Sequence, residues 1–137
     1  MRTIGSIIWP SDAASAVRLY LSFLVAVLDV LEIRFEHFLN DPLLLTKRFL
    51  LGEISEEERA DAAAEWWAYL DENKAIQEFR ERRALMARLA ICLLSIKEKD
   101  SIELGENLSW FFEVLGFLGV NLDAPIDLME NYFSFKR

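Results

Sequence analysis

The chain has 137 residues, of which 53% are hydrophobic and 12% aromatic, and its 23 acidic and 15 basic side chains give a formal charge of −8. This length suits one domain with a single core, and the apolar content excludes a disordered chain. The negative charge repels phosphate backbones, so we expect no nucleic acid partner. The same charge favours encounter with a basic protein.

The residues near the start of the chain and the single cysteine indicate the compartment. Residues 1–9 lack the apolar block and the small-residue cleavage site of a signal peptide. Cys92 lies in the apolar run 89–94, so no intramolecular disulfide can form, and we expect a buried, inert thiol. We therefore expect a cytoplasmic protein.

Residues 1–10 suggest an extended arm, after which Ser11 or Asp12 caps one long helix over residues 12–39. The other helices are expected to pack around it. Apolar residues at a 4-3-4-3 spacing form one strip on this helix, and a second strip lies about a quarter to a third of the circumference away. Two apolar strips need two sets of neighbours, which is typical of a helix in the middle of a bundle. Its uncharged run, residues 19–28, is about half of the ~20 residues that a membrane span needs, so we expect no membrane association. The first strip holds Val17, Leu21, Leu24, Leu28, Leu31, Phe35 and Phe38, and the second holds Leu19, Phe23, Ala26 and Val30.

The rest of the chain predicts shorter helices separated by clear stop signals. Asp41 and Pro42 begin the next helix and Gly52 ends it. Gly119 is predicted to end the helix over residues 106–118. Ser55 followed by Glu58 has the form of a capping box. The predicted helices span residues 43–51, 55–73, 75–97, 106–118 and 124–135, and no strand is expected. The sequence therefore predicts an all-α, single-domain bundle of five or six helices around the long N-terminal helix.

Candidate catalytic groups are few. His37, the sole histidine, continues the second apolar strip, which favours a packing role over a catalytic one. Glu32 and Glu36 beside it invite comparison with di-iron bundles, but the Glu-x-x-His motif of those proteins is missing. The five glycines form no phosphate-binding pattern. We expect no enzymatic activity, no metal and no cofactor.

The third helix carries the most informative surface pattern. Four acidic residues fall within about 60° of one another, opposite an apolar face of Ala60, Ala63, Ala64, Trp67 and Leu70. One interpretation is a solvated face partly neutralised by Arg80, Arg82 and Arg83. The other is a docking surface for a basic partner, with Trp66 and Tyr69 as anchors beside the acids. The four acidic residues are Glu58, Asp61, Glu65 and Glu72.

Two other features have structural explanations. Arg88 lies within an apolar sequence, so we expect a buried guanidinium paired with Asp29 or Glu113. The aromatic cluster of Tyr132, Phe133 and Phe135 is interpreted as closing the core, although an exposed cluster would mark a dimer contact.

Charge, size and the lack of catalytic groups favour a protein-binding module. Such a protein would sequester a basic partner, for example a toxin, as an immunity or antitoxin protein does. One alternative is a homo-oligomeric structural protein, for example a homodimer that buries its surplus aromatic residues. The other is a bundle whose two-sided helix lines a cavity for a hydrophobic ligand.

Overall fold

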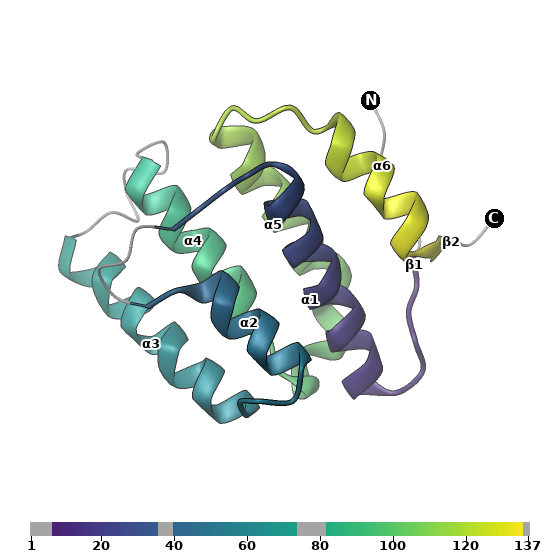
Figure 1. Cartoon of the computed structure of the whole chain (residues 1–137), viewed down its shortest axis with the longest axis horizontal. Helices are drawn as coiled ribbons and strands as arrows, with labels where there is room; N and C mark the ends of the chain where they lie inside the picture. The colour runs from purple at the N-terminus through teal and green to yellow at the C-terminus, as the bar shows by residue number, and fades with distance from the viewer. Residues whose placement is uncertain (1–6, 36–39, 74–81, 136–137) are drawn as a thin grey trace.

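A computed structural model describes residues 7–35, 40–73 and 82–135, which form six α-helices, one 3-10 helix and a short antiparallel sheet. The predicted all-α, single-domain bundle is confirmed (Figure 1). The α-helices are α1 (Ala13–Val30), α2 (Pro42–Leu50), α3 (Glu56–Asn73), α4 (Arg82–Leu94), α5 (Leu104–Phe117) and α6 (Asp123–Tyr132). The 3-10 helix η2 spans Glu98–Glu103, and the strands are β1 (Ile7–Ile8) and β2 (Ser134–Phe135).

The first three helices begin at the caps that the sequence predicts. Asp12 and Asp41 each accept a hydrogen bond from the backbone N–H three residues further on, at 2.8 and 3.1 Å. The Ser55 hydroxyl accepts from the N–H of Glu58 at 3.0 Å, and the Glu58 carboxylate accepts from the N–H of Ser55 at 3.2 Å. The capping box is therefore present, and it satisfies two backbone donors at the start of α3.

The end of α1 differs from the prediction, because the helix stops at Val30 instead of continuing to Leu39. Glu32 adopts a left-handed backbone with φ 57°, and its N–H donates to the carbonyl of Asp29 at 3.1 Å. The N–H of Ile33 donates to the carbonyl of Leu28 at 3.0 Å. These two bonds define a Schellman motif, which ends a helix by reversing the backbone twist.

Glycine normally takes the left-handed position of this motif. α2 and α5 follow that rule, since Gly52 and Gly119 have φ values of 79° and 80°. α1 uses Glu32 instead, and the apolar spacing continues beyond it, so the sequence pattern contained no stop signal. His37 and the predicted helix end at residues 36–39 lie outside the described residues.

Two helices form the centre of the bundle. α1 contacts α2, α5, α6 and η2, while α4 contacts α2, α3 and α5. Nine of the thirteen α4 residues are buried, including all six of the apolar run 89–94. Its described part is shorter than the predicted 75–97, and residues 75–81 lie outside the described residues. Figure 1 shows α1 between α2 and α3 on one side and α6 on the other.

The composition of α1 also fits a membrane-spanning helix. It has 18 residues with a mean hydropathy of 1.7, and half of this stretch is buried inside the bundle. A core helix with neighbours on two sides has the same composition, so the hydropathy of α1 agrees with its place in the fold.

The two ends of the described chain meet in the short sheet, which the sequence did not predict. Ile7 pairs with Phe135 and Ile8 pairs with Ser134, so the helix predicted to reach residue 135 ends at Tyr132. The ring of Phe133 lies 5.2 Å from the ring of Trp9 and 4.9 Å from that of Phe23. Phe133 is buried, so this part of the C-terminal aromatic cluster closes the core.

Candidate functional site

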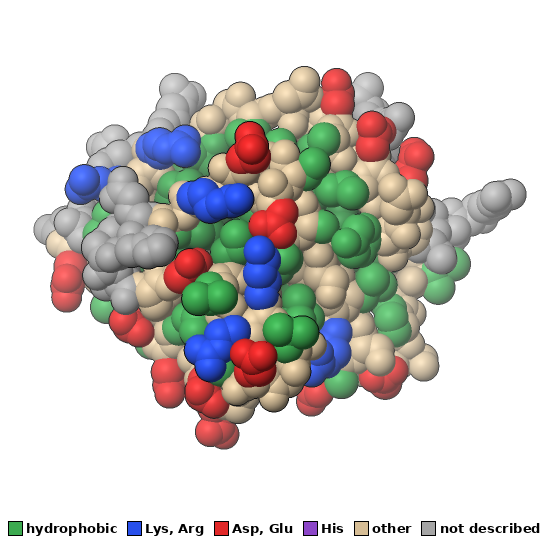
Figure 2. All heavy atoms as spheres, viewed as in Figure 1, with side chains coloured by type: hydrophobic (Ala, Val, Ile, Leu, Met, Phe, Trp, Pro, Cys, Tyr) green, Lys and Arg blue, Asp and Glu red, His purple; other side chains and the backbone are tan. Residues whose placement is uncertain are grey.

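α3 lies at the edge of the bundle, with one side packed on α2 and α4 and the other in solvent. We call the solvent side the α3 face, and it contains six acidic residues and no lysine or arginine. Figure 2 shows carboxylate side chains along the lower left margin of the molecule, where Figure 1 places α3. The α3 face consists of Glu57, Glu58, Asp61, Ala64, Glu65, Trp67, Ala68, Asp71 and Glu72.

The structure corrects the roles of the two adjacent tryptophans. Trp66, predicted as an exposed anchor, is only 2% exposed, whereas Trp67 and Ala64, predicted in the core, are on the surface. The indole N–H of Trp66 donates to the side-chain oxygen of Asn40 at 2.9 Å, which satisfies this polar group inside the protein. Tyr69 is half-buried, with its ring edge-on to Trp66 at 6.0 Å. Trp67, 44% exposed, therefore replaces Trp66 as the aromatic group available to a partner.

The four predicted acidic residues are all exposed, but their carboxylates differ in their local contacts. Glu58 belongs to the capping box, and Glu65 accepts a long hydrogen bond of 3.4 Å from the Asn40 side chain. Asp61 and Glu72 lie on the same exposed arc of the helix. Substituting these two residues therefore tests the charge of the α3 face without disturbing the capping box or the Asn40 contact.

Arginines of the next helix were predicted to neutralise part of the acidic charge on α3. The ion pairs in the described part of the chain bear on this prediction. There, Lys47 pairs with Asp29 at 3.2 Å and Arg48 pairs with Glu53 at 3.3 Å, and neither pair includes an α3 residue. Arg82 and Arg83 are exposed, and Arg80 lies outside the described residues. Within the described residues, the acids of the α3 face are exposed and form no ion pair, and like charges occupy neighbouring positions.

Arg59 is a buried cation that the sequence pattern did not single out. It is fully buried on the inner side of α3, where its Nη2 donates to the carbonyl of Leu93 at 2.7 Å. Its guanidinium carbon lies 4.4 Å from the centre of the Phe49 ring. Its Nε and Nη1 atoms are buried without a hydrogen-bond partner, and burial lowers the pKa of Arg59 to about 10.

The role of Arg59 is to cap α4. Leu93 is in the last turn of α4, where carbonyl groups have no partner within the helix. A cation at this end also interacts favourably with the helix dipole. The helical projection contained a signal for this, because Arg59 shares one face with Ala62, Ala63, Trp66 and Leu70, all of them buried.

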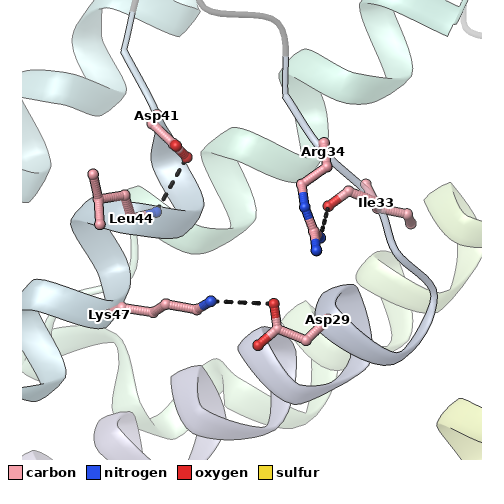
Figure 3. A network of polar contacts seen from close by, with 6 residues as sticks. All are labelled: Asp29, Ile33, Arg34, Asp41, Leu44 and Lys47. Carbon is pink, nitrogen blue, oxygen red and sulfur yellow. Dashed lines mark hydrogen bonds and ion pairs between the residues drawn. The ribbon is translucent and has the colours of Figure 1, made fainter.

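Arg88 was predicted to pair with Asp29 or Glu113. Asp29 pairs with Lys47, as Figure 3 shows, and Glu113 is exposed on α5. The Arg88 guanidinium lies over the Trp110 ring, with 5.7 Å between its carbon and the ring centre. An aromatic face therefore contacts this partly buried cation, and burial lowers the pKa of Arg88.

Cys92 is buried in α4, and burial raises the pKa of its thiol. Such a group carries little thiolate at neutral pH and is a poor nucleophile. Among residues 7–35, 40–73 and 82–135, no three histidine, cysteine or acidic side chains are grouped as in a metal site.

The architecture defines an all-α, single-domain helical protein with an acidic outer helix. No protein-family model, curated protein or solved structure matches the chain.

Proposed function

We propose that the protein is a non-enzymatic, cytoplasmic binding module that sequesters a basic protein on its α3 face. Its mode of action would resemble that of an immunity or antitoxin protein that covers the working surface of a toxin. The observation that supports this proposal is the composition of the α3 face, in which six exposed acids accompany an exposed Trp67 and no basic side chain.

The two kinds of residue would contribute differently to binding. The acids raise the rate of encounter with a basic surface, and each rim charge adds about 1 kcal/mol or less to the affinity. Trp67 is 44% exposed, so a partner could cover about 100 Å² of it, which is worth roughly 2–3 kcal/mol. Ala64 and Ala68 lie on the same exposed arc, and their small side chains let a partner approach the helix closely.

The test compares capture of partners by two charge variants. Asp61→Lys with Glu72→Lys reverses charge on the α3 face, whereas Glu113→Lys with Asp127→Lys makes the same change in net charge on α5 and α6. All four residues are exposed, so each substitution should change the free energy of unfolding by about 0.5 kcal/mol or less. Melting temperature and helicity establish that both variants fold.

Proteins retained from host lysate at low and high salt are then identified by mass spectrometry. We expect a basic protein that binds the wild type and the α5/α6 variant, dissociates in high salt and does not bind the α3 variant. Trp67→Ala should weaken binding of the same partner by roughly 2 kcal/mol, with little change in the salt dependence. Equal loss of binding in both charge variants would show that only net charge matters and would contradict a site on α3.

A further inference from the structure

A second surface feature lies between the end of α1 and the start of α2. It is a solvent-open pocket of about 200 Å³, and Figure 3 shows side chains from both segments directed toward it. The pocket is lined by Arg34, Phe35, Asp41, Leu43, Leu44 and Lys47. It does not include residues of the α3 face, so it is independent of the proposed function.

The two cations of this pocket retain donors for a ligand. Arg34 is exposed and donates from Nη1 to the carbonyl of Ile33 at 3.1 Å, a bond that orients the guanidinium without neutralising it. The ammonium of Lys47 donates to Asp29 at 3.2 Å, which uses one of its three N–H groups. The two groups approach the pocket from different elements, so they can contact one anion from two sides (Figure 3).

The remaining lining limits the kind of anion. Asp41 accepts a hydrogen bond from the N–H of Leu44, so its carboxylate is held at the start of α2 and faces the positive end of the helix dipole. Of the two cations, Lys47 is already ion-paired with Asp29, so Arg34 carries the charge that no carboxylate of the described residues compensates. One such charge matches a singly charged anion better than a doubly charged phosphate. Phe35, Leu43 and Leu44 supply an apolar wall.

We infer that this pocket binds a small organic monoanion, namely a carboxylate attached to an aryl or short alkyl group. Arg34 and Lys47 hold the carboxylate, because a guanidinium fork matches its two oxygens and an ammonium adds a point charge. Phe35, Leu43 and Leu44 contact the apolar body. A pocket of about 200 Å³ accommodates a ligand the size of phenylacetate.

The experiment is a titration of the full-length, isotopically labelled protein with phenylacetate, followed by backbone amide chemical shifts. We expect saturable shifts at Leu43, Leu44 and Lys47, with a Kd of about 1 mM. Arg34→Gln and Lys47→Gln should each weaken binding at least about five-fold, since each removes one charge-assisted contact in a solvated site. Arg48→Gln is the matched control, because Arg48 lies on α2, pairs with Glu53 and does not line the pocket.

Two further probes separate the roles of charge and apolar contact. Phenylacetamide keeps the ring but has no charge, and inorganic phosphate keeps charge but has no apolar body. Both should bind at least about five-fold more weakly than phenylacetate. Absence of saturable shifts with phenylacetate, equal binding of either probe, or unchanged binding in the Arg34 and Lys47 variants would overturn the assignment.

Discussion

Replacing Arg59 with methionine should leave the protein nearly as stable as the wild type, although the side chain is fully buried. Burial lowers the pKa of Arg59 to about 10, so the folded protein holds this charge about 3 kcal/mol less favourably than the unfolded chain does. Methionine removes that cost. It also deletes the hydrogen bond to Leu93, worth about 1.5–3 kcal/mol, and the contact with Phe49, worth about 1–2 kcal/mol.

These opposing terms nearly cancel, so we expect Arg59→Met to change the free energy of unfolding by about 1 kcal/mol or less. The carbonyl of Leu93 keeps a second contact, because the Thr46 hydroxyl lies 3.4 Å from it. Arg59→Ala loses the same polar contacts and also leaves a cavity. It should therefore be about 2–5 kcal/mol less stable than the methionine variant.

The assay is urea unfolding of the three proteins at several pH values. Because the folded pKa of Arg59 is lowered, the cost of its charge is relieved, and the protein gains stability, only as pH rises above about 10. Between about pH 5 and pH 9 both the folded and unfolded states are protonated, and the differences between the variants should stay constant. If methionine were as damaging as alanine, the polar contacts of Arg59 would outweigh the cost of burying its charge, and the reasoning would be refuted.

Three more predictions test local features. Glu32→Gly should raise the free energy of unfolding by about 1 kcal/mol, because glycine adopts φ 57° without strain. Ala64→Gly, in an exposed part of α3, should instead lower the free energy of unfolding by about 1 kcal/mol. Urea unfolding measures both changes, and changes of the same sign would contradict the argument. The pKa of Asp12 lies below 3.8, because its carboxylate accepts hydrogen bonds at the start of α1. The stability that Asp12 contributes is therefore present above pH 3.8 and is lost as pH falls through the lowered pKa of the folded protein. The melting temperature of Asp12→Asn should therefore depend less on acidification than that of the wild type, and equal pH dependence would count against the cap. Cys92 should react with a thiol reagent only after unfolding, and reaction of the native protein at the unfolded rate would show that the thiol is accessible.

Local sequence signals predicted the parts of the fold that depend on neighbouring residues. Asp12, Asp41 and Ser55 start helices because their side chains satisfy backbone donors three residues away. Gly52 and Gly119 end helices because glycine adopts a positive φ. The end of α1 escaped prediction because Glu32 occupies that conformation against its intrinsic preference.

The rotation of α3 could not be decided from its own residues. Alanines occur around much of the helix, and Trp66 and Trp67 lie about 100° apart, so two different apolar faces satisfy the helical spacing. The structure selects the face with Trp66, which bonds to Asn40 from another part of the chain. The same rotation buries Arg59, whose partner Leu93 is 34 residues away. The predicted acidic residues stay exposed under either rotation, but the aromatic anchor changes to Trp67.

The sequence by itself therefore determined the helical class, the caps and the acidic arc, because each follows from composition or from contacts within one turn of helix. Tertiary structure alone decided which side of α3 is buried and which groups meet at the pocket between α1 and α2. It also paired β1 with β2, which lie at opposite ends of the described chain. The physical reason is that these outcomes depend on hydrogen bonds and burial between distant segments, and helical spacing carries no information about such partners.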